Sequence, residues 1–528
     1  MTAASLLILV LTLCVQQFVL AVDPVVDLGY AKYRGISRTE GIIRWAGMRY
    51  AKAPTRMNGL RFKAPQDPEP QDGIIDADEF GALCIGTGTD LKQEVGGNFS
   101  EDCLFANVFA PADATKDSKL PVFVFIQGGG FNINGNANYN GTKLIRAADN
   151  NIIIVNFNYR VGPYGFLASK EIQEDSTLSL NNGLKDQRQL LKWVKTHIQS
   201  FGGDPDHVTL GGASAGAGSV VLQLTAYGGR DDKLFQAAAA ESPAAPPLRD
   251  VTENQFAFDA LRKKMGCKNL KCMQELDAVK FQNAVRELRI PFPGAKNPPL
   301  YFYNPTLDYD FIRDYTYNEL QAGHFINVPT IFGYTTNEGT IFTPKSVETV
   351  GKAETFIRDQ FVNLNRADMT MIRQVWGGPP DLFYDPRWRT YAASIYGHIR
   401  YTCPSLNASA AYTTKSTSPT YSYRWNVGSA LHVADLGPIW NNATQAPGVF
   451  IQSYWASFIR SFDPNKHIHD FVLPGGTRLK SPKWETFGDG VGKRMMFGDD
   501  NHAGMEEVSV DDREKCRVIT GLGTQLQQ

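Results

Sequence analysis

The chain has 528 residues, of which 43% are hydrophobic and 20% are charged, and its formal net charge is −1. This is an ordinary globular composition, and the near-neutral balance gives no argument for binding of nucleic acid or of an anionic membrane surface. The length fits two to four domains, or one large α/β domain with insertions. No internal repeat, low-complexity tract or long linker divides the chain.

Residues 1–21 are predicted to be a secretory signal peptide. An apolar run over residues 5–13 is followed by Val-Leu-Ala at 19–21, which is a small-residue cleavage site. A membrane anchor is the alternative, but Gln16 and Gln17 interrupt the apolar run and no stop-transfer flank follows. We therefore expect a secreted protein with no stable membrane insertion.

Six of the seven cysteines remain after the signal peptide, because Cys14 lies within it. An even number in a secreted chain favours disulfides. The spacing suggests two local loops, Cys84…Cys103 and Cys267…Cys272, after which Cys403 and Cys516 would tie the C-terminal region together. None of them has the spacing of a metal site, and we expect no metal or other cofactor. Four N-glycosylation sequons are expected at the surface, at Asn98, Asn140, Asn407 and Asn442.

Short apolar runs alternate with helical patterns after a loop-rich first region with short antiparallel strands, residues 23–120. Strands are predicted at 122–126, 152–157, 208–210, 328–333 and 420–425, and helices at 183–199 and 448–462. The run at 122–126 is apolar throughout, as expected for a strand covered on both faces. Residues 243–325 are predicted to form an insertion of helices and loops, and residues 345–415 to form helices. The alternation indicates an α/β fold.

Gly-Ala-Ser-Ala-Gly at 212–216 has the G-x-S-x-G pattern of a nucleophile elbow. It follows the predicted strand 208–210, and Val220, Val221 and Leu224 after it have helical spacing. In such a strand–turn–helix only small residues fit beside the serine. The sequence therefore predicts Ser214 as a nucleophile, with the backbone N–H of Ala215 at a helix N-terminus, where it can face an oxyanion.

A serine nucleophile needs a histidine to take its proton and a carboxylate to orient that histidine. All three should follow strands at the same edge of the sheet. Of the eight histidines, only His432 and His502 come shortly after predicted strands, and the small-residue loop around His432 favours it. Glu338 directly follows the strand at 328–333 and is the predicted acid. Asp435 is close to His432 in sequence and is expected to orient the loop.

Gly128, Gly129 and Gly130 follow the strand at 122–126 and let the main chain approach a substrate carbonyl. We expect the N–H groups of Gly129, Gly130 and Ala215 to form an oxyanion hole.

With these motifs in place, the chain resembles the type-B carboxylesterase/lipase family, the cholinesterase-like α/β-hydrolases, as a secreted fungal member. The motifs are SEDCLFANV at 100–108, QGGGF at 127–131, NYRVGPYGFL at 158–167, NGLKDQ at 182–187, FGGDP at 201–205, GASAG at 212–216 and NEG at 337–339. The resemblance implies one α/β-hydrolase domain over 22–528, with a large, mostly parallel sheet and helical cap insertions. It also implies the triad Ser214, Glu338 and His432, disulfides Cys84–Cys103 and Cys267–Cys272, and a possible third between Cys403 and Cys516.

Two departures from the family pattern bear on the substrate. Gln127 stands where many members have His, a change that other members share. Ala213 stands where many have Glu, and in cholinesterases that glutamate lies in the choline-binding gorge, so a choline ester is disfavoured. In yeast-type lipases of the family the first disulfide loop carries a long amphipathic lid, whereas residues 85–102 here are mostly polar.

The sequence therefore favours a secreted serine carboxylesterase that hydrolyses small-molecule esters through an acyl-enzyme. Three alternatives stay open: a pathway-specific esterase, lactone-forming or acyl-transfer enzyme of fungal secondary metabolism; an interfacial lipase; and a non-catalytic adhesion protein on a hydrolase scaffold, which the intact triad disfavours. The sequence does not indicate the oligomeric state.

Overall fold

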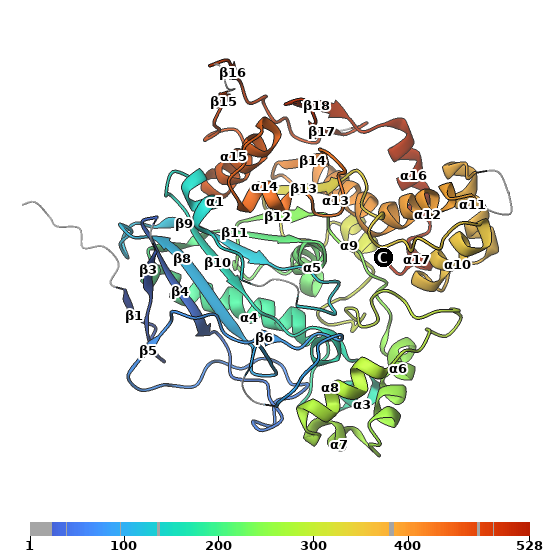
Figure 1. The fold of residues 1–528 in the computed structure, drawn as a ribbon, viewed down its shortest axis with the longest axis horizontal. Helices are drawn as coiled ribbons and strands as arrows, with labels where there is room; N and C mark the ends of the chain where they lie inside the picture. The colour runs from blue at the N-terminus through green and yellow to red at the C-terminus, as the bar shows by residue number, and fades with distance from the viewer. Residues whose placement is uncertain are drawn as a thin grey trace, which may run out of the picture.

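The computed structural model describes residues 24–38, 40–94, 97–134, 138–379, 385–472, 476–488 and 490–528, so the predicted signal peptide lies outside the described residues. A mixed sheet of 11 strands runs through the centre of the molecule (Figure 1). In spatial order its strands are β18 (Ala503–Glu507), β17 (Lys493–Gly498), β14 (Thr420–Asn426), β13 (Thr330–Thr335), β12 (Ala237–Glu241), β11 (Gly203–Ala213), β9 (Leu120–Ile126), β10 (Ile153–Phe157), β8 (Phe105–Pro111), β4 (Ile42–Arg49) and β3 (Ile36–Arg38).

The strands from β17 to β10 in this order are parallel to one another, and the outer strands β18, β8, β4 and β3 pair antiparallel. The sheet is flanked by helices, which confirms the predicted α/β-hydrolase fold. The carboxyl ends of β11, β13 and β14 therefore lie at the same edge, where three predicted site residues follow them.

Strand β9 shows why the central strands read as continuous apolar runs. Val122 and Val124 belong to one hydrophobic cluster, with residues of α4 (Asn182–His197) and α5 (Ala215–Gly229). Phe123 and Phe125 belong to a second cluster, with residues of α1 (Thr142–Ala147), α14 (Leu436–Trp440) and α15 (Ala446–Ser461). Successive side chains point to opposite faces, so a strand buried on both faces must be apolar at every position.

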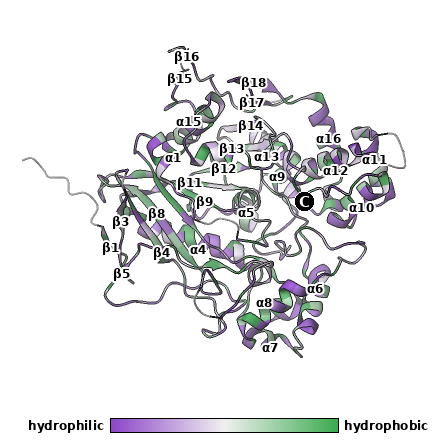
Figure 2. Cartoon of the chain, viewed as in Figure 1, coloured by the Kyte–Doolittle hydropathy of each residue, from purple (hydrophilic) through white to green (hydrophobic). Residues whose placement is uncertain are grey.

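Most helices of the two predicted helical regions lie at the periphery, and the last helix of each region lies closer to the sheet (Figure 1). The first contains α6 (Val251–Lys264), α7 (Leu270–Glu275), α8 (Ala278–Glu287) and α9 (Thr316–Ala322). The second contains α10 (Val350–Gln360), α11 (Arg366–Trp376), α12 (Arg387–Gly397), a π-helix over His398–Thr402 and α13 (Cys403–Lys415). Figure 2 shows hydrophilic and hydrophobic residues alternating along outer helices such as α6 and α11, as in amphipathic helices that bury one face. No helix among the described residues is long and apolar enough to cross a membrane.

The first region agrees only in part with the prediction of short antiparallel strands. Strand β4 pairs antiparallel with both β3 and β8. Strands β1 (Val25–Asp27) and β2 (Lys32–Arg34) do pair antiparallel, but β2 pairs with β5 (Ile74–Asp76) in parallel. Strands β6 (Leu83–Cys84) and β7 (Phe99–Ser100) are also parallel. Long connections join each parallel pair, and such crossovers allow parallel pairing, whereas tight hairpins impose the antiparallel kind.

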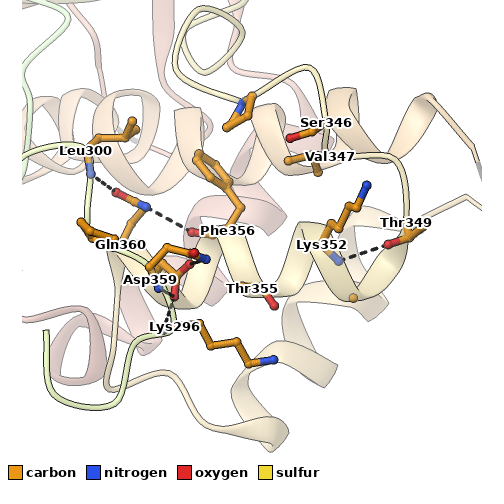
Figure 3. Close-up of a pocket in the computed structure, with 14 residues that line it drawn as sticks. Lys296, Leu300, Ser346, Val347, Thr349, Lys352, Thr355, Phe356, Asp359 and Gln360 are labelled. Atoms are coloured by element: carbon orange, nitrogen blue, oxygen red, sulfur yellow. Dashed lines mark hydrogen bonds between the residues drawn. The ribbon is translucent and has the colours of Figure 1, made fainter. Parts of the chain in front are cut away.

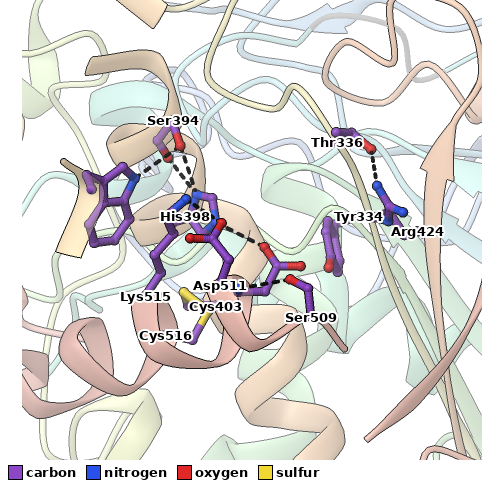
Figure 4. Close-up of polar contacts among 12 residues, drawn as sticks. Tyr334, Thr336, Ser394, His398, Cys403, Arg424, Ser509, Asp511, Lys515 and Cys516 are labelled. Atoms are coloured by element: carbon purple, nitrogen blue, oxygen red, sulfur yellow. Dashed lines mark hydrogen bonds and ion pairs between the residues drawn. A yellow bond between two sulfur atoms is a disulfide. The ribbon is translucent and has the colours of Figure 1, made fainter. Parts of the chain in front are cut away.

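Three disulfides join Cys84 to Cys103, Cys267 to Cys272 and Cys403 to Cys516. Figure 4 shows the last of these beside a polar network at the start of α16 (Val510–Gly521). His398 Nε2 lies 3.4 Å from Asp512 Oδ1, and Arg494 Nη1 lies 3.0 Å from Asp512 Oδ2. Burial raises the pKa of Asp512, but the hydrogen bond with His398 and the charge of Arg494 bring that pKa well below its usual range. Helix α16 is thus held to α13 by a covalent bond and to β17 by the ion pair between Asp512 and Arg494.

Candidate active site

Ser214 is the single residue between β11 and α5, and its backbone is unusual. Its φ of 58° and ψ of −122° lie outside the regions that residues with a side chain normally adopt. Its N–H donates to Glu241 O at 2.9 Å, and its carbonyl accepts from Gly218 N at 2.8 Å and from Ala244 N at 3.0 Å. The surrounding main chain therefore holds the strained turn in place. A Cβ at Gly216 would overlap the carbonyl oxygen of Ile126, so only glycine fits there.

His432 links Ser214 to Glu338. It lies in the loop after β14, and its Nε2 is 2.8 Å from Ser214 Oγ. Its Nδ1 hydrogen-bonds Glu338 Oε2, and the other carboxylate oxygen, Oε1, accepts from Thr335 N at 2.7 Å. Both side chains are buried. With a carboxylate at Nδ1, the imidazole proton lies on Nδ1, and Nε2 accepts the hydroxyl hydrogen of Ser214. The structure thus brings the three predicted residues into one chain of hydrogen bonds.

Two aromatic rings fix the imidazole from the side. The ring centroid of Tyr401, in the π-helix, lies 4.2 Å from that of His432, and Phe342 approaches edge-on at 5.1 Å. Tyr301 packs near Phe342, with ring centroids 6.2 Å apart. These rings keep the histidine in a largely apolar environment, in which its bonds to Ser214 and Glu338 are stronger than in water.

The predicted oxyanion loop lies beside the serine. A Cβ at Gly128 would sit 3.0 Å from Ser214 Cβ. Gly130 has a φ of 61°, and a Cβ there would overlap the ring of Tyr301. No group among the described residues accepts a hydrogen bond from the backbone N–H of Gly129, Gly130 or Ala215. Three main-chain donors next to Ser214 are therefore free for an incoming oxygen.

Two further carboxyl groups are buried near the triad. Asp435 is fully buried and accepts a hydrogen bond from the hydroxyl of Tyr423, and burial raises the pKa of Asp435 to about 6. Glu241 is also fully buried, and burial together with the charge of Asp435 raises its pKa well above the usual range. Glu241 is not among the site residues predicted from the sequence. The available signal was a charged residue directly after the alanine run at 237–240, and the structure pairs it with Ala213.

The remaining sequence-predicted residues lie elsewhere. His502 is exposed in the turn between β17 and β18, and none of its hydrogen bonds reaches the triad. Asn98, Asn140 and Asn442 are exposed, whereas Asn407 is half-buried in α13 and donates to Thr520 Oγ1 at 2.9 Å. No cluster of metal-ligating side chains occurs in the described part of the chain.

A cavity of about 640 Å³ lies between residues 296–300 and α10 (Figure 3). Leu300 donates its backbone N–H to Gln360 Oε1 at 2.9 Å across the cavity, and Phe356 also lines it. Ser214 does not line this cavity. Two of its lining residues are close in sequence to rings near His432: Leu300 precedes Tyr301, and Pro344 follows Phe342 by two residues.

Comparison with known proteins agrees with the geometry. The model of the carboxylesterase family matches residues 22–513. The crystal structure of Aspergillus niger EstA is similar to this one, with a TM-score of 0.86. The two chains are 35% identical, over 96% of this chain and 99% of the EstA chain. Secreted lipase 4 of Gibberella zeae is 29% identical, over 84% of this chain and 82% of the relative. Para-nitrobenzyl esterase of Bacillus subtilis is 35% identical, over 61% of this chain and 64% of the relative. This chain therefore belongs to the carboxylesterase family and is a hydrolase of carboxylic ester bonds.

Proposed function

We propose that Ser214 is the nucleophile, His432 the general base and acid, and Glu338 the residue that orients and stabilises the imidazolium. The observation that carries this proposal is the unbroken hydrogen-bond chain Glu338–His432–Ser214 at the end of β11. His432 Nε2 takes the hydroxyl proton as Ser214 Oγ attacks the ester carbonyl. The carboxylate of Glu338 stabilises the positive charge that forms on the imidazole.

The tetrahedral oxyanion is stabilised by the N–H groups of Gly129, Gly130 and Ala215, which have no other partner among the described residues. His432 then gives its proton to the departing alcohol oxygen, which leaves an acyl-enzyme on Ser214. In the second half-reaction His432 takes a proton from water, the hydroxide attacks the acyl carbon, and Ser214 leaves with the proton returned to it. The products are an alcohol and a carboxylic acid.

We infer that the substrates are soluble esters rather than emulsified lipids. The reason is that the first disulfide loop, between Cys84 and Cys103, packs against the rest of the protein and is hydrogen-bonded to it. Its larger apolar residues Ile85 and Leu91 are buried, so they are not available to a lipid surface. Gln282 Nε2 donates to the carbonyls of Gly86 and Thr89 at 2.8 and 2.9 Å. The described part of this loop contains no amphipathic helix that could act as a lid.

We also propose that the protein is secreted. The predicted signal peptide, the three disulfides and the exposed positions of Asn98, Asn140 and Asn442 support this proposal. Two fungal relatives are described as secreted lipases. Mass spectrometry of the mature protein should find an N-terminus at Val22 and glycans on these asparagines. An intact N-terminal segment on protein from the medium would contradict the cleavage site.

Hydrolysis of 4-nitrophenyl acetate, butyrate, octanoate and palmitate, with and without an emulsified interface, tests the substrate class. We expect fast cleavage of the short esters, independent of the interface. A sharp rise in rate on palmitate at the interface would show that the protein is an interfacial lipase. No cleavage of any of the four, with Ser214 still labelled by an organophosphate, would instead favour a dedicated biosynthetic substrate.

A further inference from the structure

Arg400 is a buried cation without a counter-charge. It lies in the π-helix His398–Thr402, a kind of element that is frequent at functional sites, and only 3% of the residue is exposed. Its Nη1 donates to the carbonyl of Ala245 at 3.2 Å. Its Nε and Nη2 are buried and have no hydrogen-bond partner. A guanidinium carries five donors, so most of its hydrogen-bonding capacity is unused.

The other buried arginines of the described chain show that this is not the usual arrangement. Four of them form ion pairs with carboxylates: Arg61 with Glu101, Arg160 with Asp186, Arg188 with Asp232, and Arg494 with Glu506 and Asp512. Burying a charge is costly unless a partner compensates it, which explains these pairs. Arg400 and Arg249 are the two buried arginines of the described residues that have no ion pair.

Arg249 lies close enough to Arg400 for the two charges to repel each other. It is 4% exposed, and its guanidinium lies over the ring of Phe292 at 3.8 Å. Burial, with the charge of Arg400 added, lowers the pKa of Arg249 to about 10, although Glu253 opposes this shift. The carboxylate of Glu253 accepts instead from Gln527 Nε2, at 2.8 Å to each oxygen. Two buried cations therefore share one region, and neither guanidinium forms an ion pair with the Glu253 carboxylate, which acts on Arg249 only from a distance.

This region adjoins the catalytic groups. The residue after Arg400 is Tyr401, whose ring packs on His432. The residue before the Ala245 carbonyl that Arg400 binds is Ala244, whose N–H donates to Ser214 O at 3.0 Å. The guanidinium carbon of Arg400 also lies 5.9 Å from the ring centroid of Tyr301, the ring that covers Gly130. Arg400 is thus next to the residues that flank the serine, the histidine and the oxyanion loop.

We propose that Arg400, supported by the charge of Arg249, binds a carboxylate of the substrate, so that the preferred esters carry a negative charge on the acyl or on the alcohol part. This inference rests on the proposed function of Ser214, because it assigns the substrate class of the same site. A carboxylate fits the planar fork of a guanidinium and can take up donors that are otherwise unused. A neutral ester leaves them unpaired, which costs about 10- to 100-fold in kcat/KM.

Two matched pairs of esters test the proposal. In the first, mono-4-nitrophenyl glutarate carries the carboxylate on the acyl part, and 4-nitrophenyl pentanoate is its neutral match. In the second, 4-acetoxybenzoate carries the carboxylate on the alcohol part, and its methyl ester is the neutral match. We expect the wild-type enzyme to prefer the anionic ester at least tenfold, by kcat/KM, in one pair. The pair concerned identifies the part of the substrate that Arg400 binds.

In folded Arg400→Gln the ratio of kcat/KM for the anionic ester to that for the neutral ester should fall to about one, because only the anionic ester loses a contact. Arg188→Gln is the matched control, because it removes a buried arginine that has its own carboxylate partner and lies outside the site. It should keep the wild-type preference. Thermal unfolding of each variant monitors folding.

Equal or faster cleavage of the neutral ester in both pairs by wild-type enzyme would overturn the proposal. Equal slowing of both members of a pair by folded Arg400→Gln would do the same. If that variant does not fold, inhibition of the wild-type enzyme tests the proposal instead. Glutarate should compete with 4-nitrophenyl butyrate for the enzyme, and glutaramide should not. Equal inhibition by glutarate and glutaramide would reject the carboxylate site. Failure of an organophosphate to label Ser214 would contradict the proposed triad. That result is distinct from a loss of the preference for anionic esters, which concerns Arg400 alone.

Discussion

Asn337, which precedes the proposed catalytic acid, is bonded to the loop that carries the proposed base. Its backbone N–H donates to Ala430 O at 2.9 Å, and its side-chain Nδ2 donates to Ser429 O at 2.9 Å. The two segments form a parallel bridge between Asn337 and Leu431, one residue before Glu338 and His432 respectively. The register between the acid and the histidine is therefore set by main-chain pairing beyond the ends of β13 and β14.

Asn337→Ala should weaken this pairing without removing it, because the backbone bond remains. We expect kcat to fall about three- to tenfold with little change in KM, since one bond worth about 1 kcal/mol is lost. Asn441→Ala is a matched control, because it removes one exposed side-chain bond to a carbonyl elsewhere, that of Gly437. The idea is rejected if both variants lower kcat equally.

Ser214→Ala should fold like the wild-type protein and lose nearly all turnover. The substitution removes only the nucleophilic oxygen, so kcat should fall by at least about 10⁴-fold, with residual catalysis from the oxyanion donors. Steady-state hydrolysis of 4-nitrophenyl butyrate, with circular dichroism as the folding control, measures this. Activity near the wild-type level would exclude Ser214 as the nucleophile.

Glu338→Gln should retain the position of the side chain but not its charge. The amide cannot stabilise the imidazolium and favours the wrong tautomer of His432, so kcat should fall about 10³- to 10⁴-fold. Asp435→Asn is the comparison, because Asp435 is buried nearby but bonds to Tyr423 rather than to His432. We expect the asparagine variant to lose much less activity, and the reverse order would assign the role of Glu338 to Asp435.

Asp435→Asn should also change how stability depends on pH. The pKa of an unfolded aspartic acid is about 3.9, and burial raises the pKa of Asp435 in the folded protein to about 6. Between these values the folded state binds more protons than the unfolded state, so the ionisation of Asp435 lowers stability as pH rises. The asparagine variant does not titrate there. Relative to the wild-type protein it should therefore gain up to about 3 kcal/mol between pH 4 and pH 7.

Denaturant unfolding of both proteins across that range measures the difference. Asp72→Asn is the control, since Asp72 is exposed, and it should run parallel to the wild-type protein. A constant difference between Asp435→Asn and the wild-type protein from pH 4 to pH 7 would show that Asp435 has an ordinary pKa.

The sequence predicts those features of the fold that depend on local pattern. The apolar run at 122–126 indicated a strand covered on both faces, and in β9 all five of these residues are buried. The small residues around Ser214 indicated a tight turn because a strand and a helix meet there with no room for a Cβ at Gly212 or Gly216. The acid and the histidine could be selected because parallel strands bring their carboxyl ends to one edge.

The buried polar residues around the site could not be predicted in the same way. Glu241, Arg249 and Arg400 have no sequence pattern that marks them as buried, and in most chains such charged residues are solvated. Their burial depends on segments far apart in sequence, such as the contact of Arg400 with Ala245. The parallel pairing of β2 with β5 likewise depends on a long connection whose path has no local signature.

The Cys403–Cys516 bond should contribute more to stability than the Cys267–Cys272 bond. It spans 113 residues and joins α13 to α16, whereas the other spans five. A cross-link removes more conformational entropy from the unfolded chain when the loop is longer: about 5 kcal/mol for a loop of about 100 residues, and about 2 kcal/mol for the short one. The double variant Cys403→Ser/Cys516→Ser should therefore unfold at clearly lower denaturant concentration than Cys267→Ser/Cys272→Ser. If both variants lose the same free energy of unfolding, the strain or solvation of each bond outweighs loop entropy in this protein.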